Sequence, residues 1–349
     1  MSKLVESVPN FSEGRRLDVV DRIASAAAGV PGVHLLDRTS DASHNRSVIT
    51  LAGRPDLVAD ALEAAMAVAI DEIEMDRQTG EHPRIGAIDV VPFIPLGDMT
   101  MAEAVAIARA FGARVSERFD LPVYLYAEAA IRPDRVRLAD VRRGEYEGLR
   151  SSVRNDPERV PDFGPERLHP TAGAVAVGAR PFLIAWNVNL ATTDLELAKG
   201  IAAHVRESSG GLPKVQAKAF CLDEPDCVQV SMNLLDTGTT PMWQVFEAVR
   251  DEAAAASVDV LESELIGLAP LRAFLDVADH AGAPGDGDPA DRFLAAARWL
   301  RLRDPDPSMA LELRLAAAGP ADGGAAGDAD GAAAGPAAGD AAGPADGSA

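Results

Sequence analysis

Cysteine, basic residues and long apolar runs are all scarce in this chain, and each shortage excludes a class of protein. The two cysteines, Cys221 and Cys227, form neither a CxxC pair nor a cysteine–histidine cluster, so we expect free thiols in a cytoplasmic protein. No apolar run approaches the roughly 20 residues of a membrane helix, and the opening MSKLVESVPN lacks a signal-peptide core. Acidic residues outnumber basic ones by 54 to 33, giving a formal charge of −21. Because phosphate binding requires a basic stripe, we expect no nucleic-acid partner. Because no membrane helix is indicated, we expect no membrane partner either.

The common chemical signatures are missing as well. The chain has no Gly-x-Gly-x-x-Gly after a strand, no phosphate-binding loop ending in Lys-Ser/Thr, no His-Glu-x-x-His and no Gly-x-Ser-x-Gly. Nucleotide-binding, zinc-protease and serine-hydrolase functions therefore have little support, and we expect no metal.

What the chain does contain is an alternation of strand and helix patterns. Strands are predicted at 3–9, 33–37, 46–52, 87–94 and 123–126, and helices at 14–28, 55–77 and 100–118. Apolar residues recur at helical spacing along the second of these helices. Ser12 is placed to cap the first helix and Gly29 to end it, while Thr100 and Glu103 form a capping box for the third.

The second half of the chain repeats this order. Strands are predicted at 182–189, 214–220, 227–234 and 260–266, and helices at 193–207 and from 240 onward. The expected caps are Thr193 with Glu196, and Thr240 ahead of Pro241. Each half reads β-α-β-β-α-β, the unit of a ferredoxin-like fold. A duplication would explain the repeat, although two such units can also arise separately.

These patterns predict an α+β protein with subdomains at 1–180 and 181–315. The first subdomain ends in a segment at 127–180 that is rich in proline, glycine and charge, and we interpret it as a crossover between the halves. Residues 316–349 contain only Ala, Gly, Pro, Asp and one Ser. Such a segment has no branched or aromatic side chain to bury, so it is predicted to be a disordered acidic tail.

One turn carries the best candidates for chemistry. The segment GEHPRIG at 80–86 lies between the long helix and an apolar strand, a position typical of binding loops. Pro83 keeps His82 out of helical geometry, and a histidine next to Arg84 would place a proton-transfer group beside an anion holder. A surface loop that carries both residues by chance remains the alternative.

Other polar clusters are weaker candidates. Asp41 to Arg46, including Asn45, is dense in hydrogen-bonding groups but also typical of a turn. The stretch from Asn10 to Gly14 joins a strand to a helix, where anions bind, although capping by Ser12 explains most of it. Asp162 to Pro165 forms a turn on the crossover, and Lys214, at the start of a strand, is by itself an ordinary solvated lysine.

Taken together, several stretches resemble the formiminotransferase domain, which in animals is joined to a cyclodeaminase. The resemblance extends from about residue 3 to 275, and the GEHPRIGA segment is its most specific part. The stretches that carry it are LVESVPNFSEGRR (4–16), HNRSVITLAG (44–53), GEHPRIGAIDVVPFIPL (80–96), PVYLYAEAA (122–130), PDFGP (161–165), GARPFLIAWNVNL (178–190), KVQA (214–217) and VQVSMNLLD (228–236).

The resemblance implies two ferredoxin-like subdomains facing each other across a ligand cleft, a homodimer, and tetrahydrofolate as co-substrate. It implies that His82 is catalytic. It also implies that folate contacts Lys214 and the stretch from Phe163 to Thr171, from which we take Phe163, Gly164 and Pro165 as candidate residues. Asn10, Asn45, Arg46 and Arg84 are the further binding candidates. Animal members have an acidic residue where this chain has Thr39, so Asp41 is the possible carboxylate partner of His82.

The implied reaction moves a formimino group from N-formimino-L-glutamate to N5 of tetrahydrofolate. One imidazole can take the proton from N5 and give it to the leaving glutamate nitrogen. Formyl transfer between 5-formyl-tetrahydrofolate and glutamate is an alternative, because the two carbons differ only in carrying oxygen or NH. A folate-binding protein without turnover is a more distant one. Too few residues follow position 280 for a cyclodeaminase, so ring closure is expected from a separate protein.

Overall fold

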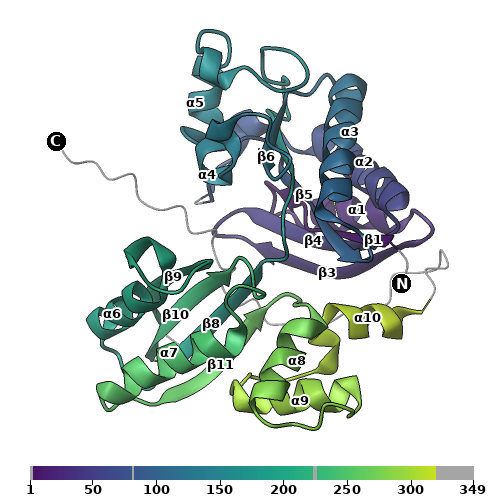
Figure 1. Cartoon of the computed structure of the whole chain (residues 1–349). Helices are drawn as coiled ribbons and strands as arrows, with labels where there is room; N and C mark the ends of the chain where they lie inside the picture. Colours follow the sequence, from purple (N-terminus) through teal and green to yellow (C-terminus); the bar gives the residue numbers. More distant parts are fainter. Residues whose placement is uncertain (1–2, 81, 223–225, 320–349) are drawn as a thin grey trace. The chain divides into compact units, whose positions relative to one another are not determined.

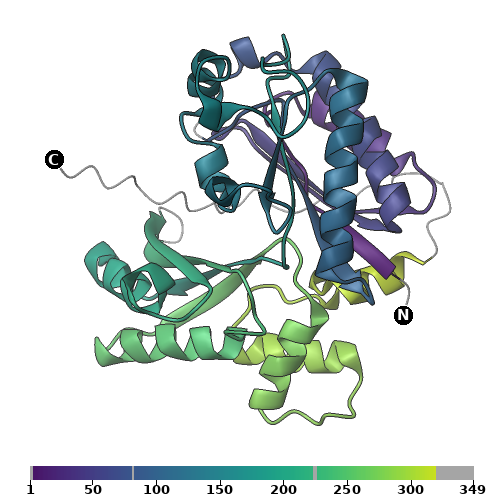
Figure 2. The same ribbon diagram turned by 45° about the horizontal axis from the view of Figure 1, so that its top comes forward.

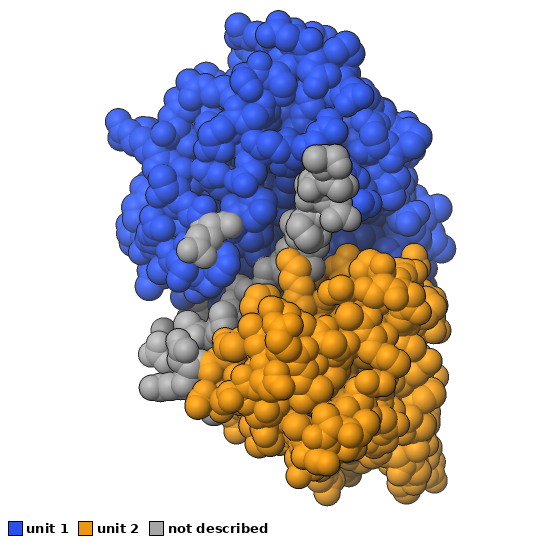
Figure 3. Space-filling view, turned by 90° about the vertical axis from the view of Figure 1, so that its left-hand side faces the viewer, with its two compact units in different colours: residues 1–181, 320–336 blue, residues 182–319, 337–349 orange. Residues whose placement is uncertain are grey.

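The computed structural model describes residues 3–80, 82–222 and 226–319, which form two compact units (Figure 1). The first unit ends at Pro181 and the second begins at Phe182, as Figure 3 shows in two colours. Each unit has its own sheet and its own hydrophobic core.

The first sheet is built on the predicted βαββαβ unit. The strands of this sheet, including three outside the unit, are β1 (Lys3–Ser7), β2 (Asn10–Phe11), β3 (Val33–Asp41), β4 (Arg46–Gly53), β5 (Ile88–Gly97), β6 (Val123–Ala127) and β7 (Val175–Ala179). Strand β1 lies between β4 and β5, and β3 pairs with the outer side of β4, all antiparallel. This is the strand arrangement of a ferredoxin-like unit.

Strand β7 corrects the sequence prediction, which treated all of 127–180 as a crossover. It pairs in parallel with both β5 and β6 and so fills the place between them. The same segment also forms α4 (Leu138–Val141) and α5 (Glu145–Ser152).

The helices of the first unit pack on both faces of its sheet. Helices α1 (Leu17–Ala28), α2 (Pro55–Glu72) and α3 (Met101–Phe119) share one core with the strands. Side chains of β6 alternate between the two faces of the sheet. Val123 and Leu125 belong to this first core, whereas Tyr124 and Tyr126 lie in a second core with residues of α4 and α5. The crossover therefore covers the opposite face of the sheet.

The second unit contains the other predicted βαββαβ unit. Its strands are β8 (Ile184–Leu190), β9 (Val215–Leu222), β10 (Cys227–Leu234) and β11 (Val260–Ile266), paired in the order β11-β8-β10-β9 with every neighbour antiparallel. Helices α6 (Leu195–Val205) and α7 (Met242–Ala255), which are drawn in teal and green in Figure 2, share its core. Both halves thus have the same strand order, which confirms the predicted α+β fold.

Three helices after β11 were not predicted: α8 (Leu271–His280), α9 (Pro289–Trp299) and α10 (Leu311–Ala318). Phe274 of α8 and Phe293 of α9 are fully buried and lie edge to face at 4.5 Å between ring centroids. Helix α10 continues three residues into the stretch 316–349 that was predicted as a tail, and residues 320–349 lie outside the described part of the chain.

Some predicted caps are correct and others are not. Thr100 and Glu103 form the expected capping box of α3, and Gly29 ends α1. Asp194 caps α6 in place of Thr193, because its carboxylate reaches the N–H groups of Glu196 and Leu197. Ser12 and Thr240 cap no helix: their hydroxyl groups donate to the carbonyl oxygens of Gly86 and Pro213 at 2.7 and 2.6 Å.

Candidate active site

Three segments far apart in the sequence meet at a small pocket of the first unit. They are the β2 segment, the loop between β3 and β4, and the turn that precedes β5. The pocket has a free volume of about 10 Å³, the space of about one water. Its lining consists of Asn10, Phe11, Ser12, His44, Asn45, Arg46, His82, Arg84 and Asp89. Five of the sequence candidates are therefore brought together: Asn10, Asn45, Arg46, His82 and Arg84.

Close backbone approach makes this meeting possible. A Cβ atom on Gly14 would lie 2.2 Å from the carbonyl oxygen of Asp41, and one on Gly80 would lie 2.2 Å from that of His44. Any side chain at either position would force the β3–β4 loop away from its neighbours. The glycines that flank the candidate residues thus serve loop packing.

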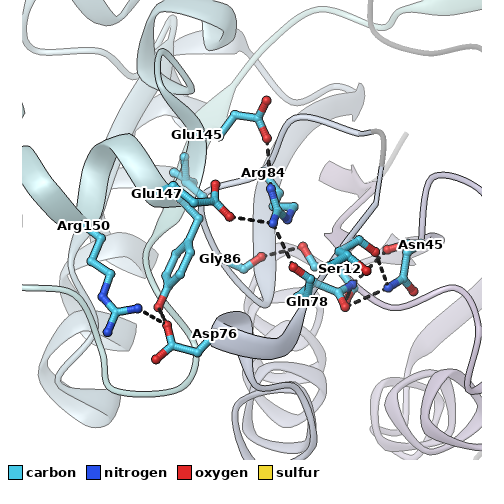
Figure 4. Close-up of polar contacts among 12 residues, drawn as sticks. Ser12, Asn45, Asp76, Gln78, Arg84, Gly86, Glu145, Glu147 and Arg150 are labelled. Atoms are coloured by element: carbon cyan, nitrogen blue, oxygen red, sulfur yellow. Dashed lines mark hydrogen bonds and ion pairs between the residues drawn. The ribbon is translucent and has the colours of Figure 1, made fainter.

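Asn45 and Gln78 tie the three segments together (Figure 4). The Asn45 side chain accepts from the Gly14 N–H at 3.0 Å and donates to the Gln78 side chain at 2.7 Å. Gln78 in turn donates to the carbonyl oxygens of Ser12 and Asn45. Asn45 adopts a left-handed backbone, with φ of 50°, which asparagine tolerates better than most residues. Its visible role is to hold the loops, and Gln78 is a site residue that the sequence reasoning missed.

His82 lies in the pocket wall and is only 4% exposed. Strand β5 and the buried neighbours Ile85 and Ala87 fix the chain beyond it. A buried imidazole on a turn that leads into a fixed strand has few orientations open to it, which suits proton transfer.

Arg84 is also buried, but protein groups engage the ends of its guanidinium. Its Nη1 forms an ion pair with Glu145 at 3.0 Å, and its Nη2 forms one with Glu147 at 2.9 Å. The same Nη2 donates to the backbone carbonyl of Gln78 at 2.9 Å. Both acids come from α5, on the crossover, as Figure 4 shows.

Arg46 offers the second guanidinium of the pocket. It donates through Nη2 to the side-chain oxygen of Asn10, whose amide nitrogen donates to the carbonyl of Val8 at 2.9 Å. Strand β2 holds Asn10 against both β4 and β5. The pairing of Asn10 and Arg46 was not anticipated, although both residues were candidates.

Asp41 contacts a second histidine. Its carboxylate accepts from His44 Nδ1 at 2.8 Å and from the backbone N–H groups of Ser43 and His44 at 2.8 and 2.9 Å. Burial would raise the pKa of Asp41, but the hydrogen bonds from the backbone and imidazole of His44 outweigh it and lower that pKa. The ionised carboxylate places a proton on Nδ1 of His44, a pocket residue that sequence reasoning missed.

Asp89 is the carboxylate in the pocket lining. It is almost fully buried, accepts from the backbone N–H of Ile85 at 2.9 Å and pairs with Arg142 of the crossover. The signal for it was present in the sequence, because an acid in the apolar run AIDVVPFIP requires a partner when it is buried.

The structure does not place the predicted folate residues in this pocket. The turn with Phe163, Gly164 and Pro165 bonds to the start of β6, where Val123 N–H donates to the Phe163 carbonyl at 2.9 Å. Lys214 belongs to the second unit, just before β9, and has a left-handed backbone with φ of 61°.

Within the described ranges no helix has the length and apolar character to cross a membrane. The same residues contain no group of three or more metal-ligating side chains.

Fold and site together define an α+β protein of two ferredoxin-like units whose first unit carries an imidazole–guanidinium pocket. Residues 4–180 match the N-terminal subdomain of the formiminotransferase domain, and residues 185–282 match the formiminotransferase domain. The chain belongs to the formiminotransferase family.

Relatives support this assignment over most of the chain. A glutamate formimidoyltransferase of Thermoplasma acidophilum is 48% identical over 279 residues, covering 79% of this chain and 91% of the relative. One from Streptococcus pyogenes serotype M1 is 42% identical over 280 residues, covering 80% and 93%. The formimidoyltransferase-cyclodeaminase of Gallus gallus is 46% identical, and the matched region is 52% of its length.

Proposed function

We propose that the chain is a transferase that moves the formimino group of N-formimino-L-glutamate to N5 of tetrahydrofolate, giving 5-formimino-tetrahydrofolate and glutamate. The observation that carries this proposal is the convergence of His82, Arg46 and Arg84 on one pocket. Support also comes from the two similar glutamate formimidoyltransferases, because this chain matches more than nine tenths of the length of each.

The proposed chemistry assigns the proton transfers to His82. N5 of tetrahydrofolate attacks the formimino carbon, a new C–N bond forms, and the C–N bond to glutamate breaks. The imidazole of His82 accepts the proton that N5 loses and returns it to the departing nitrogen of glutamate, so charges and protons balance. Such general acid–base catalysis contributes roughly 10²–10⁴ in rate, and alignment of the two substrates supplies much of the remainder.

Asp41 remains our candidate for the acid that assists this histidine. Because its carboxylate bonds His44, a pocket residue, we propose that Asp41 acts through that second imidazole. This arrangement would keep the Nε2 atom of His44 available as an acceptor.

Arg46 is our candidate for binding a carboxylate of the glutamyl substrate, with Asn10 holding its guanidinium and Asn45 holding the loop from which it extends. Arg84 is a weaker candidate than the sequence suggested, since Glu145 and Glu147 already bind it.

We assign folate binding to Phe163, Gly164, Pro165 and Lys214 from the family resemblance. We further propose a cytoplasmic homodimer without a metal.

Supplying each donor separately tests the proposal. The purified protein is incubated with tetrahydrofolate and N-formimino-L-glutamate, or with glutamate and 5-formyl-tetrahydrofolate, and the folate products are separated. Formation of 5-formimino-tetrahydrofolate in the first reaction supports the proposal. Turnover in the second reaction alone would establish formyl transfer instead, and folate binding without either product would establish a binding protein.

A further inference from the structure

The crossover is linked to the His82 turn by ion pairs of opposite polarity. Arg84, in the turn, pairs with the acids Glu145 and Glu147, whereas Asp89, near the start of β5, pairs with the base Arg142. The three groups that lie deepest, Arg84, Asp89 and Arg142, are each less than a tenth exposed. Charges that are buried this far require partners, so these contacts fix the turn and the crossover relative to each other.

Helix α5 is itself held firmly. The hydroxyl of Tyr146 donates to the Asp76 carboxylate at 2.6 Å, and Arg150 pairs with the same carboxylate (Figure 4). Leu149 is fully buried in the core that also contains Ile85. A helix anchored this way presents its acids from a fixed position.

The backbone at the start of α5 has an unusual conformation at Glu145, the residue whose carboxylate pairs with Arg84. Gly144 and Glu145 both adopt left-handed conformations, with φ of 80° and 55°. A left-handed glutamate costs on the order of 1 kcal/mol, and a glycine there would avoid the cost. Glutamate at this position supplies instead a carboxylate that reaches Arg84.

The two acids determine the charge balance around the imidazole. His44, Arg46, Arg84 and Asp89 line the pocket with His82, and Arg142 offsets the charge of Asp89. Glu145 and Glu147, whose side chains are 43% and 64% exposed, both pair with the single positive charge of the buried Arg84. Without them, Arg84 would retain only the Gln78 carbonyl among its described partners, and its positive charge would act on the pocket.

We propose that Glu145 and Glu147 are positioning residues for the proton transfer: through Arg84 they hold the His82 turn and supply the negative charge that offsets this arginine. The inference rests on the proposed function. It also assigns the crossover helix α5 a part in the active site, although neither acid lines the pocket.

The test uses Glu145→Gln, Glu147→Gln and the double variant, with Glu158→Gln as the matched control. Glu158 is an exposed acid of the same crossover, paired at 3.1 Å with the exposed Arg143, so its replacement removes an acid and its ion pair from the crossover without touching a residue of the pocket. We expect kcat of the double variant to fall about tenfold, as for a small misplacement of a catalytic group, with KM for both substrates within twofold. The control should match the native protein.

A second readout separates positioning from general loosening of the fold. Loss of both acids leaves a positive charge near the imidazole, which disfavours its protonated form. The acidic limb of kcat/KM and the NMR titration of the His82 ring, assigned by its absence in His82→Ala, should both move to lower pH. A purely structural role would lower the thermal midpoint without this displacement.

Several outcomes would overturn the inference. An unchanged NMR titration in the double variant would do so whatever the activity. A lower KM for the glutamyl substrate with unchanged kcat would show that the acids instead compete with substrate for Arg84. If the native protein transferred no formimino group, the proposed function would fail, while the NMR titration would still decide whether these acids control the His82 environment.

Discussion

Replacement of His82 is the most direct perturbation of the proposed mechanism. The side chain is 4% exposed, in a pocket of about 10 Å³, so few water molecules can substitute for it in the proton transfer. Loss of an acid–base group of this kind lowers the rate by roughly 10²–10⁴, equivalent to about 2.7–5.4 kcal/mol in the barrier. We expect His82→Ala to lose kcat within this range.

Folate binding should respond much less than kcat, because the groups assigned to bind it are not among the residues that line the His82 pocket. The assay is single-turnover transfer from N-formimino-L-glutamate to tetrahydrofolate, with folate affinity measured separately. His204→Ala is a suitable control, since that histidine is a largely exposed residue of α6 in the second unit. In the native protein the unprotonated imidazole is the active form, so kcat/KM should fall toward acidic pH as the imidazole gains a proton, and the Ala variant should lack this limb.

The Asn variant at position 82 decides between chemistry and structure. Asparagine is polar and of similar size but does not titrate near neutral pH. If His82 only shaped the loop ahead of Pro83, His82→Asn would restore most of the activity. A near-normal Asn variant would therefore refute the proton-shuttle role and the mechanism built on it.

Three further predictions concern the loops, folate and the C-terminal helix. Gly80→Ala should lower kcat at least tenfold, because its Cβ would lie 2.2 Å from the His44 carbonyl and displace the loop; native kinetics in this variant would show that the loops can separate harmlessly. Lys214→Ala should raise KM for tetrahydrofolate, more so for polyglutamylated forms, and leave kcat within a few-fold, whereas a large kcat loss at unchanged KM would contradict its assignment. A chain ending at Gly319 should keep native activity and thermal midpoint, whereas one ending at Ala310 loses the fully buried Leu311 and should melt about 5–10 °C lower; equal midpoints by calorimetry would show that α10 contributes no stability.

The order of helices and strands was predictable because each half has its own apolar periodicity and boundary residues. Thr100 with Glu103 and Gly29 act through local hydrogen bonds, which a sequence displays directly. Strand β7 was missed for a physical reason. Its sequence VAVGA is short, small and buried throughout, as parallel strands in the middle of a sheet are, so it shows no alternation of polar and apolar residues.

The candidate site was partly predictable for similar reasons. His82, Arg84, Asn45 and Asn10 occur in stretches whose composition indicated binding, and the structure brings them to one pocket. Their partners could not be read from one sequence. Arg84 pairs with acids that are 61 and 63 residues away, and only the packing of the crossover on the sheet makes them neighbours.

Once these partners are known, residues that look like ordinary turn formers prove to support the candidate catalytic residue. Asn45 and Gln78 use their amide groups to join loops, and Asp41 orients His44. These bonds hold the residues around His82 before any substrate arrives. Because the cost of ordering them is met during folding, it does not add to the reaction barrier. The same asparagine and aspartate that identify an ordinary turn in the sequence thus give the proposed proton shuttle its fixed geometry.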